Sequence, residues 1–385
     1  MIWACLSLVL VGFAVSLPGT WLARRVGRRL GALDSAGVPG QVKAAARKVP
    51  NTGGVGIFLG FAAPVVAGLV VLRLLPAETA ADLVPGIAAH LPGLAERTPM
   101  AVVLLLCALV LHVVGLIDDR RALGPFVKLA VMVGVAAAAV IFTRTRLLEL
   151  LDARVGGPWL SIAVTVLWIV VVTNAMNFLD NMDGLSGGVG FVAAACFAAA
   201  ALIQGQWFVG ACFALLAGAL LGFLVFNVAP ASVFMGDGGS LVVGFLLSFL
   251  AVRITYFDGV TGGPASGAWY GVLMPLVVLA VPLYDFVSVT LIRLSQGRSP
   301  FVGDRQHVSH RVVERGLSRP AAVAVIWGLA GVTGVAGIAL GSLKPWQAGL
   351  VGAQVLLVLL TLAAFERFSR MQHSPQGHRD REKDT

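Results

Sequence analysis

Apolar runs of about 20 residues recur along almost the whole chain, and they constrain the fold more than any other feature of the sequence. A helix needs about 20 apolar residues to cross the hydrocarbon core of a membrane. Only 12% of the residues are charged, whereas a soluble domain carries about 25% because its surface must face water. The sequence therefore predicts an all-α polytopic membrane protein with eleven transmembrane helices, and it excludes a soluble globular enzyme.

The predicted spans leave no loop long enough to hold a soluble domain. They occupy 1–22, 51–75, 100–117, 126–142, 158–178, 186–204, 206–226, 240–257, 268–291, 321–341 and 346–364. The runs at 126–142 and 240–257 are the weakest. We expect one transmembrane domain over 1–365, which must also carry any catalytic site, and a basic, disordered tail over 366–385.

The positive charges indicate how the chain is oriented in the membrane. Cytoplasmic loops are enriched in Lys and Arg. With the N-terminus outside and the C-terminus in the cytoplasm, 21 of the 28 Lys and Arg residues fall on the cytoplasmic side. Most of the net charge of +9 is thus explained by topology and by the anionic inner leaflet, so nucleic-acid binding loses its support. The expected location is the inner (plasma) membrane.

Two adjacent aspartates end the third predicted span. Asp118 and Asp119 lie at a helix C-terminus, where the helix dipole disfavours negative charge. Either a divalent metal or a cationic patch formed by Arg120, Arg121 and Lys128 must compensate them. A solvated helix end is the bland alternative, but ionisable residues at the edge of a span more often serve function.

Four oxygen-bearing residues follow one another at intervals of three at the end of the fifth span. Asn174, Asn177, Asp180 and Asp183 would lie along one helical face and its end. Such hard oxygen ligands suit magnesium, which takes one or two carboxylates and shares substrate phosphates. Hydrogen bonding between helices by asparagine is the structural alternative.

Two further motifs fall on the same predicted face. Asp237 lies in GDGGS, where glycines allow close backbone approach and exposed N–H groups can cradle a phosphate. A long loop carries His307, His310 and Arg311 without cysteine partners, so anion binding or proton transfer fits better than zinc. Carboxylates for a metal and cations for phosphates together indicate phosphoryl transfer at the cytoplasmic face, with one lipid and one soluble phosphorylated substrate.

These motifs, in this order, resemble the polyprenyl-phosphate N-acetylhexosamine-1-phosphate transferases of glycosyltransferase family 4. The resemblance extends from Arg47-Lys48-Val49-Pro50 to Gly316-Leu317-Ser318, nearly the whole chain. It is closer to the branch that initiates O-antigen (lipopolysaccharide) and teichoic-acid synthesis than to phospho-MurNAc-pentapeptide translocase, whose loop carries a tighter histidine run.

The resemblance implies a role for each motif residue. Asp118 and Asp119 match the pair near the lipid phosphate, one of which is often proposed as base or nucleophile, and Asn177 and Asp237 match the magnesium-associated positions. The implied catalytic residues are Asp118, Asp119, Asp180 and Asp183; the substrate-binding residues are Lys48, Lys128, Asn174, His307, His310 and Arg311; the metal ligands are Asn177 and Asp237.

Two positions depart from the family pattern. Asn181 stands where glycine usually follows the first aspartate, and Ser309 replaces one histidine of the HxHHR loop. Asparagine tolerates positive φ better than most residues, so we expect the turn at Asn181 to survive. The effect of Ser309 on activity is left open.

The implied reaction is attack of polyprenyl (undecaprenyl) phosphate on the β-phosphate of a UDP-N-acetylhexosamine, with release of UMP. UDP-GlcNAc is the default donor and Mg²⁺ the expected cofactor, with Mn²⁺ as an alternative. The partners are then the lipid carrier, the UDP-sugar and membrane lipids, with a homodimer left open. Direct attack is our hypothesis, although a covalent aspartyl-phosphate route is not excluded by sequence.

Four alternatives remain at this stage. A membrane transporter would place its ion site near the bilayer midplane, whereas these acids lie at span ends. An intramembrane aspartyl protease is suggested by Asp237 and by Tyr284-Asp285, but the usual order of that pair is reversed. Phospho-MurNAc-pentapeptide translocase is the alternative within the family, and a scaffold without activity is raised only by Ser309.

Overall fold

The computed structural model describes most of the chain, and all regular secondary structure in the described part is helical. The described residues are 1–32, 48–74, 79, 91–149, 152–254, 269–300 and 304–372, with side chains up to residue 366. The part of the predicted tail beyond Gln372 lies outside these residues. The prediction of an all-α polytopic protein is confirmed.

Long apolar helices dominate the described part. Nine of them are long and apolar enough to cross a membrane: α1 Ile2–Arg29, α2 Gly53–Leu74, α5 Thr98–Asp118, α6 Pro125–Thr143, α8 Trp159–Leu179, α9 Leu185–Ile203, α10 Trp207–Asn227, α15 Arg319–Ile338 with the short η4 Leu340–Ser342, and α16 Pro345–Gln372. A tenth candidate span is a helix pair bent by 70°, in which η3 Trp269–Leu273 and α12 Met274–Val278 precede α13 Ala280–Ser295. The short helices α4 Leu91–Glu96, α7 Asp152–Val155 and α14 Val308–Val313 lie between the long ones.

The remaining predicted span, 240–257, corresponds to a helix that differs from the others. Helix α11, Asp237–Arg253, has only 17 residues, and its stretch from Gly238 to Ala251 is entirely buried. It begins earlier than predicted, so that Asp237 is its first residue rather than part of the preceding loop. All eleven predicted runs therefore fall on helices, but α11 forms the centre of the bundle.

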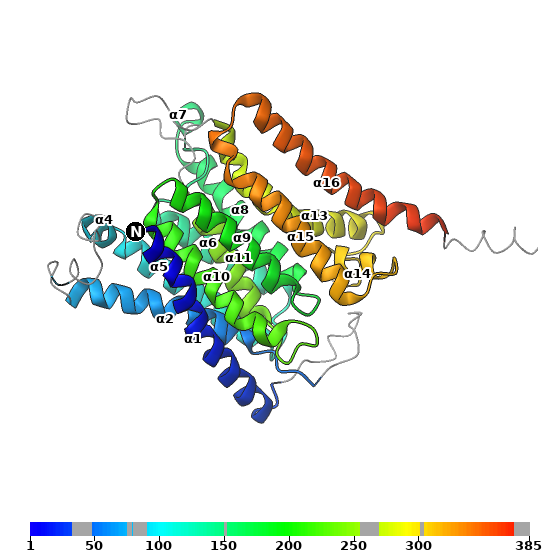
Figure 1. Ribbon diagram of the computed structural model, residues 1–385, viewed down its shortest axis with the longest axis horizontal. Helices are drawn as coiled ribbons and strands as arrows, with labels where there is room; N and C mark the ends of the chain where they lie inside the picture. The colour runs from blue at the N-terminus through cyan, green and yellow to red at the C-terminus, as the bar shows by residue number, and fades with distance from the viewer. Residues whose placement is uncertain are drawn as a thin grey trace, which may run out of the picture.

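The bundle is arranged in layers around α10 and α11 (Figure 1). Helix α1 packs against α10 and α2, and α10 packs in turn against α9. Helix α11 packs against α8, α5 and α2. On the other side of the bundle, α15 lies against α9, and α16 runs along the outside (Figure 1). The apolar residues of α16, such as Leu356 and Leu360, remain exposed, as expected for a helix that faces lipid.

Five helix ends meet at one end of the bundle and define the region of interest. They are the C-terminal ends of α5 and α8 and the N-terminal ends of α2, α6 and α11. Glycines allow this convergence, because a Cβ at Gly115 of α5 would lie 2.4 Å from the backbone nitrogen of Gly238, and one at Gly54 of α2 would lie 2.3 Å from that of Gly239. The glycines of GDGGS thus serve close packing of three helices.

Candidate active site

Lys128 joins two of the predicted aspartates. Its ammonium group, on the first turn of α6, lies 2.7 Å from Asp118 at the end of α5 and also forms an ion pair with Asp237 of α11. Asp118 accepts a further hydrogen bond from the backbone N–H of Leu123 at 2.8 Å. Of the cationic patch expected from the sequence, Lys128 is the one member that pairs with these aspartates among the described residues. Arg120 and Arg121 remain exposed.

Asp119 is tied to the start of α11. Its carboxylate accepts hydrogen bonds from the backbone N–H groups of Asp237 at 3.0 Å and Gly238 at 3.2 Å. The side-chain amide of Asn51, just before α2, donates to the same carboxylate at 2.8 Å. A carboxylate at a helix N-terminus satisfies free N–H groups and favours the helix dipole. These two N–H groups, considered above as a phosphate cradle, are thus occupied by Asp119.

The two predicted metal positions are in direct contact. The side-chain amide of Asn177, in the last turn of α8, donates to Asp237 at 2.8 Å and to the hydroxyl of Ser240 at 2.9 Å. Asp180, immediately after α8, accepts from the backbone N–H of Gly236. These contacts define one group of side chains, which we call the carboxylate cluster. It consists of Asp118, Asp119, Lys128, Asn177, Asp180 and Asp237.

The carboxylate cluster contains more negative than positive charge. Desolvation by the surrounding protein, and then the charge of Asp237, raise the pKa of Asp119 to about 8, although backbone N–H bonds from Asp237 and Gly238 oppose the shift. Desolvation and the charge of Asp237 likewise raise the pKa of Asp180 to about 7. Lys128 is the one cation that pairs with these acids among the described residues. The cluster is therefore short of positive charge.

This donor set fits magnesium bound together with a substrate rather than a closed protein cage. No three His, Cys, Asp or Glu side chains in the described part of the chain converge so as to hold a metal by themselves. Magnesium requires only one or two carboxylates when phosphates and water complete its coordination. The side chains of Asp237, Asn177 and Asp180 offer such oxygens.

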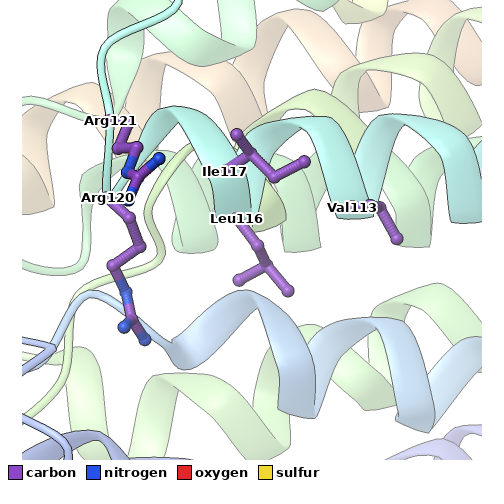
Figure 2. A pocket seen from close by; sticks show the side chains of 5 residues that line it. All are labelled: Val113, Leu116, Ile117, Arg120 and Arg121. Carbon is purple, nitrogen blue, oxygen red and sulfur yellow. The ribbon is translucent and has the colours of Figure 1, made fainter.

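An open recess of about 390 Å³ lies on the surface of α5, at the end of the helix that carries Asp118. Figure 2 shows its lining, in which Val113, Leu116 and Ile117 follow one another toward Arg120 and Arg121. Apolar side chains thus lead to two guanidinium groups directly after Asp118 and Asp119. An apolar surface that leads to two positive charges matches a lipid with an anionic head group.

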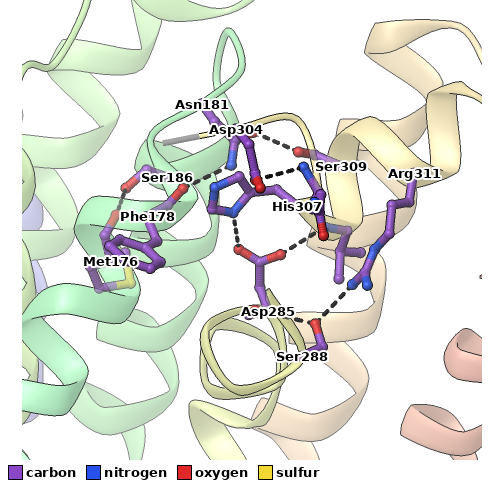
Figure 3. A network of polar contacts seen from close by, with 12 residues as sticks. Met176, Phe178, Asn181, Ser186, Asp285, Ser288, Asp304, His307, Ser309 and Arg311 are labelled. Carbon is purple, nitrogen blue, oxygen red and sulfur yellow. Dashed lines mark hydrogen bonds and ion pairs between the residues drawn. The ribbon is translucent and has the colours of Figure 1, made fainter. Parts of the chain in front are cut away.

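The histidine loop lies across α13 (Figure 3). His307 is buried, and its Nδ1 lies 2.8 Å from a carboxylate oxygen of Asp285. Arg311 is also buried; it donates to the hydroxyl of Ser288 at 2.8 Å and lies 3.3 Å from Glu366 of α16. His310, by contrast, is only half-buried, and no hydrogen bond joins its ring to another described residue.

The two departures from the family pattern contact each other. The hydroxyl of Ser309 donates to the side-chain oxygen of Asn181 at 2.5 Å, and the amide of Asn181 donates to the carbonyl of Phe178 at 2.8 Å. Among the described residues only Arg144 and Leu148 combine a side chain with positive φ. The turn at Asn181 therefore survives, as expected, but without positive φ, and the side-chain amide of Asn181 ties the end of α8 to α14.

Three sequence-predicted residues stand apart from the cluster. Lys48 is exposed before α2, and no contact with the described residues joins it to the cluster. Asn174 donates to the carbonyl of Val170 in its own helix at 2.9 Å. Asp183 accepts from the backbone of Ala231 at 2.9 Å and so orders the loop before α11.

Sequence reasoning missed several residues that support the site. They are Asn51, Ser240 and Arg293, whose partners are Asp119, Asn177 and the Asp304–His307 segment. Arg293 has no motif around it, whereas Ser240 is the last residue of GDGGS and Asn51 directly follows the quoted Arg-Lys-Val-Pro sequence, so both had a nearby signal.

Comparison with known proteins agrees with this arrangement of residues. Residues 101–255, which contain most of α5 and all of α6 to α11, match the model of glycosyl transferase family 4. The chain is 28% identical over 327 residues to a probable undecaprenyl-phosphate N-acetylglucosaminyl 1-phosphate transferase of Bacillus subtilis, covering 83% of this chain and 81% of the relative. It is 30% identical to decaprenyl-phosphate N-acetylglucosaminephosphotransferase of Mycobacterium tuberculosis, over 83% of this chain and 79% of the relative. It is also 30% identical to undecaprenyl-phosphate alpha-N-acetylglucosaminyl 1-phosphate transferase of Escherichia coli K12, over 69% and 71%.

Proposed function

The chain belongs to glycosyl transferase family 4, and on that premise we propose that it transfers N-acetylglucosamine 1-phosphate from UDP-GlcNAc to polyprenyl phosphate. The products are polyprenyl diphospho-N-acetylglucosamine and UMP. This reaction is the first membrane step in the synthesis of a cell-envelope glycan. The names of the relatives support both the sugar phosphate and the polyprenyl acceptor.

One observation carries the proposal. The helix ends that meet at one end of the bundle bring together Asp118, Lys128, Asn177 and Asp237, which are far apart in the sequence. A transporter needs its charged groups along a path through the membrane, whereas this cluster lies where the helices end. The positive-inside bias of the sequence supports a cytoplasmic position for that end, where UDP-sugars are available.

Magnesium is the cofactor we propose, held by Asp237 and Asn177 with Asp180 nearby. Bound there with the substrate diphosphate, it would neutralise the phosphate charge during transfer. The raised pKa values of Asp119 and Asp180 support a site that lacks one cation. We therefore expect Mg²⁺, added together with UDP-GlcNAc, to raise the thermal stability of the protein more than UDP-GlcNAc alone.

The residues themselves suggest different roles for the aspartate pair. Both oxygens of Asp119 are occupied by N–H donors, so Asp119 is suited to fixing α11 in place. Asp118 shares Lys128 with Asp237. Lys128 can hold the anionic lipid phosphate while Asp118 orients or deprotonates it.

The reaction itself is then a direct displacement. A phosphate oxygen of the lipid forms a bond to the β-phosphorus of the UDP-sugar, and the bond from that phosphorus to the bridging oxygen breaks. UMP leaves with the electron pair of the broken bond. The recess that ends at Arg120 and Arg121 would accept the first apolar units of the lipid.

Replacing Asp237 tests the proposed function and its metal. The variant Asp237→Ala should lower UMP release by about 10³-fold or more, because it removes a ligand and the partner of Lys128 at the reacting centre. Purified protein would be incubated with undecaprenyl phosphate, UDP-GlcNAc and Mg²⁺, and both UMP and lipid-linked sugar measured. Stabilisation by Mg²⁺ should disappear in the same variant.

Glu149 is exposed and pairs with Arg146, away from the cluster, so Glu149→Ala provides the control variant. Near-normal turnover of Asp237→Ala would refute the metal assignment. Wild-type protein that forms no lipid-linked product with UDP-GlcNAc or any other UDP-N-acetyl sugar would refute the transferase.

A further inference from the structure

Both ring nitrogens of His307 are already engaged within the protein. Nδ1 lies 2.8 Å from Asp285, whose carboxylate can only accept when ionised, so Nδ1 carries the hydrogen. Nε2 lies 3.5 Å from the guanidinium of Arg293, which can only donate, so Nε2 carries the lone pair. The two neighbours therefore select the same neutral tautomer. His307, Asp285 and Arg293 are each no more than 6% exposed.

Asp285 also fixes the start of α14. Its second carboxylate oxygen accepts from the backbone N–H of Val308 at 2.7 Å, the first helical residue of α14. One turn further along α13, Ser288 accepts from Arg311 at 2.8 Å. Residues three apart share one helical face, so a single face of α13 holds α14 at two points (Figure 3).

Arg293 continues this network toward the carboxylate cluster. Its guanidinium lies 3.0 Å from Asp304 and 5.3 Å from the ring centre of Phe178. The ring of Phe178 also meets that of His307 edge-on, at 5.8 Å between centroids. Phe178 directly follows Asn177, a proposed metal ligand. Contacts through Phe178 therefore connect His307 with the carboxylate cluster.

We propose that Asp285 is a positioning residue of the reaction, which together with Arg293 locks His307 so that α14 presents His310 to the substrate diphosphate. His307 is then an anchor rather than a substrate ligand. Of His307, His310 and Arg311, only His310 is half-exposed. This inference rests on the proposed transferase function.

Because His307 carries its hydrogen on Nδ1, the proposal can be tested by replacing His307 with either of two amide residues, asparagine or glutamine. The side-chain N–H of asparagine lies close to where Nδ1 of histidine lies, and that of glutamine lies close to where Nε2 lies. An anchor that works through Nδ1–H should thus be rescued by His307→Asn and not by His307→Gln. We expect His307→Ala and His307→Gln to lose about 100-fold in kcat, because misplacement by about 1 Å can cost that much, while His307→Asn keeps a tenth or more.

Replacing the carboxylate of Asp285 should have the same effect as removing the side chain of His307. In Asp285→Asn, the amide oxygen can still accept from Val308, but the amide NH₂ then faces Nδ1 and forces the ring proton onto Nε2, against Arg293. We expect a loss of kcat similar to that of His307→Ala, with KM for UDP-GlcNAc changed less than threefold. The matched control on the same helix is Ser295→Ala, because Ser295 is exposed and its hydroxyl donates to the carbonyl of Ile292 in α13 itself.

A double-mutant cycle separates this inference from the proposed function. Asp285→Ala, His307→Ala and the double variant are compared by thermal unfolding, which requires no activity, and by turnover. The single losses should not add, because each removes the same contact. Additive losses, or His307→Gln more active than His307→Asn, would overturn the anchor. Inactive wild-type protein would instead refute the transferase, and the unfolding cycle would still decide whether the pair is coupled.

Discussion

At the scale of single residues, the contact between Asn181 and Ser309 joins two segments that the sequence places far apart. Ser309 is fully buried, and its hydroxyl donates to Asn181 at 2.5 Å. A hydrogen bond of this kind contributes about 0.5–1.5 kcal/mol. We expect Ser309→Ala and Asn181→Ala each to lower turnover by up to about tenfold, with no further loss in the double variant. Turnover of the three variants measures this.

The residues usual in the family provide a second form of that test. Ser309→His should lower turnover more than Ser309→Ala or Asn181→Ala, because the larger ring would need the space of the Asn181 side chain. Adding Asn181→Gly should recover part of the activity. If the double variant were worse than Ser309→His alone, the two departures would be independent of each other.

His310 gives a pH dependence whose sign follows from its surroundings. Desolvation lowers the pKa of His310 to about 4, helped by positive charge on the neighbouring His307, Arg305 and Arg319 and opposed by a smaller effect of Asp285. The unfolded chain takes up this proton near pH 6.5, the folded one only near pH 4. The contribution of His310 to stability is thus present above pH 6.5 and lost as the pH falls to 4.

The corresponding experiment compares wild type and His310→Asn by thermal unfolding between pH 7.5 and about 4.5. The wild-type melting temperature should fall more steeply over this interval than that of the variant. Parallel curves would show that His310 is not the titrating group.

At the scale of elements, the outermost helix α16 reaches back to the histidine loop. Glu366 is 7% exposed and lies 3.3 Å from Arg311, and it also accepts from Tyr284 at 3.3 Å. Removing one partner of a buried ion pair leaves an uncompensated charge and costs about 3–5 kcal/mol. Glu366→Gln should therefore lower the melting temperature markedly and reduce turnover by displacing α14.

Removing the charges of both Glu366 and Arg311 distinguishes an ion pair from simple packing. The double variant Glu366→Gln with Arg311→Gln should recover part of the lost stability, because no unpaired charge remains. Glu314→Gln, an exposed acid at the end of α14, is the control and should change little. A double variant less stable than Glu366→Gln would argue against the pair.

At the scale of the whole molecule, the sequence predicts the fold better than the site. Apolar runs depend only on composition along the chain, so all eleven fall on helices. The 70° bend between α12 and α13 leaves no such signal. The roles of Asp285 and Arg293 depend on partners 22 and 14 residues away in the histidine loop. The pairing of Asp119 with α11, across 118 residues, likewise depends on packing that no local pattern encodes.

The orientation of the whole bundle is the premise on which a cytoplasmic reaction rests, and it can be measured directly. The four native cysteines are buried and would be replaced by alanine. Single cysteines would then be placed at four exposed positions, two at each expected side: Arg154 and Lys344 outside, Lys48 and Arg298 inside. A membrane-impermeant maleimide added to intact cells, or to spheroplasts if an outer membrane is present, should label the first two and reach the others only after permeabilisation. This follows because the basic loops stay on the cytoplasmic side. The opposite pattern would place the carboxylate cluster on the outer face, away from cytoplasmic UDP-sugars, and would exclude the proposed reaction whatever the cluster can bind.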